Sequence, residues 1–94
     1  MNILETIKNN KKVLVDFYAD WCGPCKKMLP VIDQLKTELS NDIEIIKVNI
    51  DENEDLAINF GVMSVPTFLF FKDGDEFERV SGVISKSDII SIFK

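Results

Sequence analysis

The two cysteines of this chain, Cys22 and Cys25, lie three positions apart in the stretch Trp-Cys-Gly-Pro-Cys at residues 21–25. The attacking species in thiol-disulfide exchange is the thiolate, and a free cysteine with a pKa of about 8.5 is only about 3% ionised at pH 7. A reactive cysteine therefore needs surroundings that stabilise its anion. A pair at this spacing, in a chain long enough to fold without structural disulfides, indicates a redox centre.

A strand pattern and a helix pattern position the two cysteines. Residues 13–18 are mostly apolar and β-branched, which is typical of a central strand covered on both faces. From Cys22 to Leu39, apolar residues recur every three or four positions and predict an amphipathic helix. Free backbone N–H groups and the helix dipole would stabilise a thiolate at Cys22. We expect Cys22 to be exposed to attack and Cys25, one turn further on, to be a shielded resolving thiol.

Three other residues in this region bear on the chemistry. Pro24 suits a first helical turn, which has no use for its missing N–H, and Gly23 leaves the approach to Cys22 open. Asp16 is a carboxylate within the apolar strand, and burial there would raise its pKa by desolvation. The alternation of residues along the strand is also compatible with a solvated or salt-bridged aspartate at a strand end.

The rest of the chain predicts three further helices and three further strands. We expect helices at 2–9, 51–60 and 85–93, and strands at 43–50, 67–71 and 76–81, with a hairpin turn at Asp73-Gly74. The order strand, helix, strand implies a right-handed parallel crossover. With 94 residues there is room for one domain spanning 1–94 and one core.

Composition excludes several classes of function. The net charge of −5 and the absence of any large basic cluster argue against nucleic acid or an anionic membrane as partner. There is no histidine, so histidine-activated nucleophiles and imidazole metal ligands are excluded. The polar N-terminal residues do not form a secretory signal, and no segment approaches transmembrane length. We therefore expect a cytoplasmic protein.

Six features in register resemble the thioredoxin family over nearly the whole chain. They are residues 15–26, Pro30, residues 47–51, residues 65–67, Gly74 and Gly82. The resemblance implies an α/β thioredoxin fold with a central mixed sheet flanked by four helices. Only twelve residues precede Val13, so we expect four strands, without the family's first edge strand. Strand 43–49 would then be an exposed edge.

The resemblance also implies roles for particular residues. Cys22 is the expected nucleophile, Cys25 the resolving thiol, Asp16 the proton acceptor for Cys25, and Lys47 a residue that tunes Asp16. The expected active-site loop comprises Trp21, Gly23 and Pro24, and the expected substrate-binding residues are Val65, a cis-Pro66, Gly82 and Val83. The ordinary alternatives are a trans proline at a strand start and a core tryptophan.

The family likeness further implies a protein-disulfide reductase. We expect disulfide-containing proteins as substrates, a thioredoxin reductase as electron source, a monomer, and no cofactor or metal. The Gly-Pro pair resembles the strongly reducing branch of the family. Tyr18, Ser64 and Ser81 depart from the common pattern and bear on partner choice.

Three alternatives remain open from the sequence. A disulfide isomerase or oxidase would need a more oxidising potential. A non-catalytic interaction module would keep the fold and use the groove around Trp21 and Pro66 without turnover. Zinc would need four ligands, which only a dimer sharing its thiolates could supply.

Overall fold

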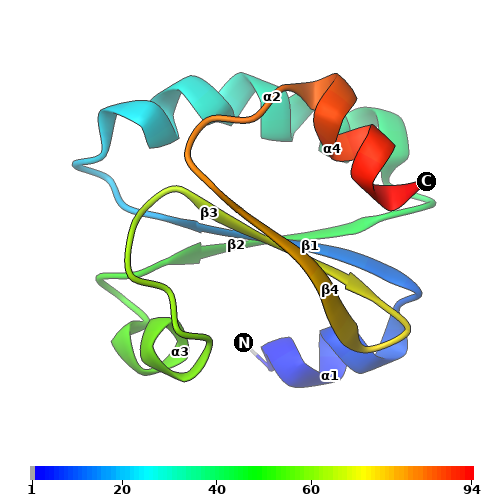
Figure 1. Cartoon of the computed structure of the whole chain (residues 1–94), viewed down its shortest axis with the longest axis horizontal. Helices are drawn as coiled ribbons and strands as arrows, with labels where there is room; N and C mark the ends of the chain where they lie inside the picture. The colour runs from blue at the N-terminus through cyan, green and yellow to red at the C-terminus, as the bar shows by residue number, and fades with distance from the viewer. Residues whose placement is uncertain (1) are drawn as a thin grey trace.

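A mixed four-stranded sheet runs through the middle of the molecule in the computed structural model, which describes residues 2–94 (Figure 1). The strands are β1 (Lys12–Tyr18), β2 (Glu44–Asn49), β3 (Thr67–Lys72) and β4 (Asp75–Ser81). The helices are α1 (Ile3–Asn9), α2 (Gly23–Leu39), α3 (Glu54–Asn59) and α4 (Lys86–Phe93). Four strands and four helices were predicted, and their positions agree to within about three residues.

The strand order is β2-β1-β3-β4, so β1 is central and β2 is an edge strand, as predicted. β1 pairs in parallel with β2 and antiparallel with β3, and β3 pairs antiparallel with β4. The predicted hairpin turn joins β3 to β4, with Asp73 at φ 52° and Gly74 at φ 89°. The parallel pair β1-β2 is connected through α2, which supplies the crossover that such a pair requires.

The helices cover the sheet on both faces. In Figure 1, α2 and α4 lie on one side of the sheet and α1 and α3 on the other. Because side chains alternate along a strand, Val13, Val15 and Phe17 point into the core beside α1 and α3. Leu14 points into the core beside α2 and α4. Asp16, two residues further on, shares the α2 face with Leu14.

Side chains cap the starts of α1 and α4, and α3 starts later than predicted. The Asn2 side chain accepts a hydrogen bond from the Glu5 N–H, and Ser85 accepts one from the Asp88 N–H. The third short helix was expected to begin at residue 51, but α3 begins at Glu54 after Asn53. Asp51 lies in the preceding turn, where its backbone N–H donates a hydrogen bond to Asn49 Oδ1.

Helix length and hydropathy bear on membrane insertion. Within the described part of the chain, no helix is long and apolar enough to cross a membrane.

Candidate active site

The site lies at one end of the sheet, where four segments meet. The parallel strands β1 and β2 both end there, since Tyr18 pairs with Asn49. The antiparallel strand β3 begins there and β4 ends there, because Thr67 pairs with both Phe17 and Ser81. α2 also begins at this end, on the left in Figure 1. The topology thus brings together residues that are far apart in the sequence.

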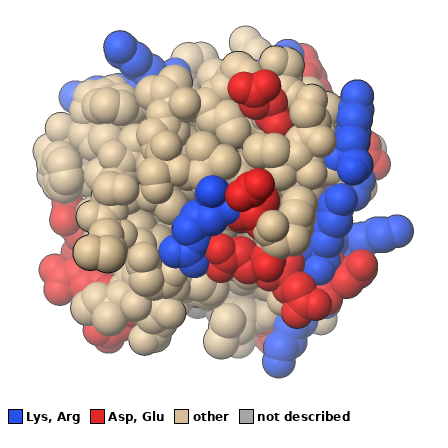
Figure 2. Space-filling view, in the orientation of Figure 1, with Lys and Arg blue, Asp and Glu red and all other residues tan. Residues whose placement is uncertain are grey.

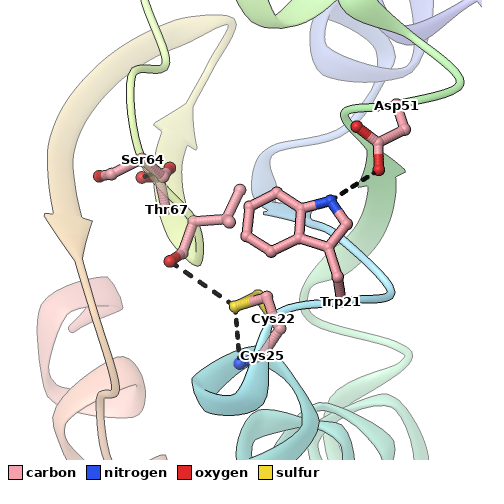
Figure 3. The surroundings of a disulfide bond; sticks show 7 residues. Trp21, Cys22, Cys25, Asp51, Ser64 and Thr67 are labelled. Atoms are coloured by element: carbon pink, nitrogen blue, oxygen red, sulfur yellow. Dashed lines mark hydrogen bonds between the residues drawn. A yellow bond between two sulfur atoms is a disulfide. The ribbon is translucent and has the colours of Figure 1, made fainter.

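Cys22 and Cys25 form a disulfide at the start of α2, with their Cα atoms 5.2 Å apart (Figure 3). Cys22 occupies the N-cap position of this 17-residue helix. The Cys25 backbone N–H donates a hydrogen bond to Cys22 Sγ over 3.1 Å. A sulfur at this position receives a donor that a helix leaves unpaired, together with the positive end of the helix dipole. This geometry favours the thiolate when the disulfide is reduced.

Cys25 is shielded in the disulfide form, as expected, but the expected exposure of Cys22 is wrong. Cys22 is 4% exposed and Cys25 5% exposed, because both pack in a small cluster with Ala19 that Val65 helps to cover. The two cysteines differ instead in what they face. Cys22 Sγ lies 3.7 Å from the Val65 carbonyl oxygen. Cys25 lines a hollow of about 240 Å³ on the side of Lys47.

Gly23 and Pro24 form the first turn of α2. A Cβ atom added at Gly23 would meet no other atom within 4 Å, so the space beside this residue is open. Pro24 costs no hydrogen bond at this position and holds φ near the helical value. Both residues therefore fit the geometry expected of them.

Asp16 is buried beneath α2 and is only 3% exposed. Its Oδ1 atom has no hydrogen-bond partner among the described residues. Desolvation raises the pKa of Asp16 from 3.8 to about 6, although Lys47 and then Lys36 act to lower it. The alternative of a solvated aspartate at a strand end is thus wrong. A carboxyl group with this pKa can exchange a proton near neutral pH.

Lys47 is the register partner of Asp16 on β2 and supplies the larger of two positive potentials acting on it. The Lys47 ammonium lies over the Tyr18 ring, 5.2 Å from its centroid. Sequence reasoning missed both this aromatic contact and the second cation, Lys36 on α2. No motif marks either contact, since both depend on how α2 and β2 pack around β1.

The loop between α3 and β3 forms a wall beside Cys22. The peptide bond between Val65 and Pro66 is cis, in agreement with the resemblance. The Pro66 carbonyl accepts a hydrogen bond from the Gly82 N–H at 2.8 Å, which ties the end of β4 to this loop. Gly82 has φ 95°, a value that favours glycine. The Thr67 hydroxyl donates to the Ser64 carbonyl at 2.7 Å and lies 3.4 Å from the Ser81 hydroxyl.

Trp21 is 68% exposed and is held at the surface by a contact that the sequence did not predict. Its Nε1–H donates to Asp51 Oδ2 at 2.9 Å (Figure 3). Val83 is 58% exposed. At the left of Figure 2, an uncharged area lies between basic side chains above and acidic side chains below. We call Trp21, Val65, Gly82 and Val83 the docking surface.

Metal ligands do not gather at this site. Among residues 2–94, no group of three or more histidine, cysteine, aspartate or glutamate side chains could hold a metal ion.

Comparison with known proteins gives one consistent family. The thioredoxin family model matches residues 2–94. A thioredoxin from Pyropia yezoensis is 42% identical over 93% of this chain and 81% of its own length. A thioredoxin from Mycobacterium tuberculosis is 42% identical over 92% of this chain and 74% of its own.

Solved structures agree with the sequence relatives. A mutant thioredoxin from Halobacterium salinarum has a TM-score of 0.86 at 39% identity, covering 94% of this chain and 76% of its own. Oxidised mitochondrial thioredoxin 3 from Saccharomyces cerevisiae has a TM-score of 0.84 at 36% identity, covering 93% of this chain and 80% of its own. Together with the disulfide at the start of α2, these matches show that the chain belongs to the thioredoxin family and is a thiol-disulfide oxidoreductase.

Proposed function

We propose that this protein is a protein-disulfide reductase that passes two electrons from its Cys22-Cys25 dithiol to disulfides in other proteins. The observation that carries the proposal is the arrangement of the two sulfur atoms at the helix start. Cys22 Sγ receives a backbone N–H and faces the Val65 carbonyl, whereas Cys25 lies on the opposite side, toward Lys47.

In the first step, the Cys22 thiolate attacks one sulfur of a substrate disulfide and expels the other as a thiolate. The product is a mixed disulfide between Cys22 and the substrate. An extended substrate segment can pair with the Val65 backbone, as added strands do in other recognition sites. The exposed side chains of Trp21 and Val83 offer apolar contacts beside it.

In the second step, Cys25 loses its proton to the Asp16 carboxylate and attacks Cys22 Sγ. The Cys22-Cys25 disulfide forms, and the second substrate sulfur leaves as a thiolate. An aspartate with a pKa of about 6 is a better proton acceptor for a thiol than an ordinary aspartate. Lys47 and Lys36 favour the ionised, accepting form.

The oxidised protein must then be reduced again, and we propose a thioredoxin reductase as the electron source. A structural neighbour at TM-score 0.85 comes from work on the thiol resolving mechanism of yeast mitochondrial 1-Cys peroxiredoxin via glutathione and thioredoxin systems. That neighbour supports disulfide-containing proteins as the class of partner. All groups invoked come from one chain, which fits a monomer, and the need for recycling fits a reducing compartment such as the cytoplasm.

Reduction of insulin disulfides with dithiothreitol or a thioredoxin reductase as donor tests the proposal. We expect the wild-type protein to accelerate the reaction and Cys22→Ser to be inactive. Cys25→Ser should accumulate a covalent adduct with substrate that mass spectrometry assigns to Cys22. Correctly folded wild-type protein that accelerates reduction with neither donor would refute the reductase proposal.

A further inference from the structure

A second hollow lies next to the docking surface, between the end of β4 and α4. It has a volume of about 530 Å³. Val80 and Val83 line it from β4 and the following loop, with Ile84, and Asp88 and Ile92 line it from α4. None of these residues except Val83 has a part in the proposed exchange reaction.

Among the described residues, Asp88 is the only charged one that lines this hollow. Its side chain is exposed, and within residues 2–94 it has no hydrogen-bond or ion-pair partner, although its backbone N–H is capped by Ser85. The nearby cation Lys86 is paired with Glu38 at 3.0 Å. Figure 2 shows largely uncharged surface over the loop between β4 and α4. The hollow is therefore lined by apolar residues, by Ser85 and Ser91, and by one unpaired negative charge.

The hollow continues the docking surface. Val83 belongs to both, and the preceding residue, Gly82, is bonded to the Pro66 carbonyl. A polypeptide that pairs with Val65 and passes Val83 thus reaches the hollow within a few residues of its cysteine.

Lysine and arginine fit this combination, because each carries an apolar stem and a charged head. We propose that the hollow is an accessory subsite for a basic side chain of the substrate protein, close in sequence to the cysteine that Cys22 attacks. The stem lies along Val80, Ile84 and Ile92, and the head reaches Asp88. The assignment rests on the proposed reductase function and adds a preference for basic substrates.

Three peptide disulfides test the subsite, identical except for lysine, methionine or glutamate at one position, with that position moved stepwise from the cysteine. At the best spacing, we expect kcat/KM to be about two- to fivefold higher for lysine than for methionine, and lowest for glutamate. The preference should weaken at high salt, since an exposed ion pair is screened.

Variants of Asp88 separate the charge from the fold. Asp88→Asn should lower kcat/KM for the lysine peptide to the value for the methionine peptide. Asp88→Lys should make the glutamate peptide the one with the highest kcat/KM. Glu5→Lys is the matched control, because Glu5 is also exposed in a first helical turn with its N–H capped, but lies on α1 across the sheet. This control should retain the wild-type preference.

Binding without turnover keeps the subsite separate from the reductase proposal. Cysteine-free versions of the peptides should shift the backbone amide resonances of residues 83–92 in the oxidised protein. The shift should be largest for the lysine peptide, smaller for methionine and smallest for glutamate. An unchanged preference in Asp88→Lys, or no lysine-dependent shift at residues 83–92, would overturn the subsite while leaving reduction intact. Lysine-dependent shifts in a protein that reduces no peptide would support the subsite and refute the reductase.

Discussion

Asp16 and Asp51 both belong to the disulfide site, and their surroundings are opposite. Asp16 lies within the central strand, is 3% exposed, and has an oxygen atom without a partner. Asp51 lies in an exposed turn after β2 and accepts a hydrogen bond from Trp21. Burial makes the first carboxyl group a proton carrier with a pKa of about 6, whereas the second holds an aromatic ring at the surface. The same type of side chain thus has two different roles, and its exposure to solvent decides which role it has.

Replacing Asp16 should have the largest effect on stability. The pKa is 3.8 in the unfolded chain and about 6 in the fold, so the buried charge destabilises the protein increasingly as the pH rises from about 4 to 6. Above that range the penalty is about 3 kcal/mol. Asp16→Asn should therefore raise the free energy of unfolding by about 3 kcal/mol at pH 7 and by almost nothing below pH 4.

Urea unfolding of the oxidised protein at several pH values measures this difference. Asp51→Asn serves as the control, because it removes an exposed carboxylate and should show no comparable gain. Equal gains for Asp16→Asn at low and neutral pH would mean that its charge is not the source of the penalty.

The two lysines near Asp16 should differ in their effect on its pKa. Lys47 is the larger influence and Lys36 the smaller, and each lowers the pKa. Lys47→Met should raise the pKa of Asp16 further above its usual range than Lys36→Met does. The pH midpoint of mixed-disulfide resolution should move upward in the same order. Carbon-13 NMR titration of the Asp16 carboxyl group measures the first effect, and rapid-mixing kinetics the second. The reverse order would mean that Lys36 on α2, and not Lys47, has the larger effect on the pKa of Asp16.

Removing the other carboxylate should have the smallest effect on stability. Asp51→Ala deletes the acceptor of the Trp21 Nε1–H, an exposed hydrogen bond that we expect to contribute less than about 1 kcal/mol. The Trp21 ring should become more mobile, which fluorescence anisotropy reports. The pH dependence of Cys25 attack should stay where Asp16 sets it. A shift of that pH profile in Asp51→Ala would mean that Asp51 also sets the pH dependence of Cys25 attack, which would contradict separate roles for the two aspartates.

The sequence predicts Asp16 better than Asp51 for a physical reason. Strand alternation and an apolar run are local, so burial and the direction of the pKa change can be expected from neighbouring residues. The bond between Trp21 and Asp51 joins residues 30 positions apart, and it depends on the adjacent ends of two parallel strands. Once that pairing is known, the contact is reasonable, but no residue pattern specifies it.

Two further features show where sequence patterns fail. The cis bond before Pro66 was predicted only from the family resemblance. Local sequence would predict a trans bond, because a proline at a strand start is ordinarily trans. The predicted exposure of Cys22 is wrong, because this helix start is covered by neighbouring segments. Packing against Ala19 and Val65 closes it in the disulfide form. Element positions follow from local periodicity, whereas side-chain exposure at a junction of several segments does not.

The reduction potential of the Cys22-Cys25 pair tests the central claim most directly. Equilibration with defined ratios of reduced and oxidised glutathione, followed by thiol alkylation and mass spectrometry, gives the value. A reductase with this helix-start geometry should lie near about −270 mV, the value typical of thioredoxin. A potential near about −180 mV or higher, the range of disulfide isomerases and oxidases, would contradict the account.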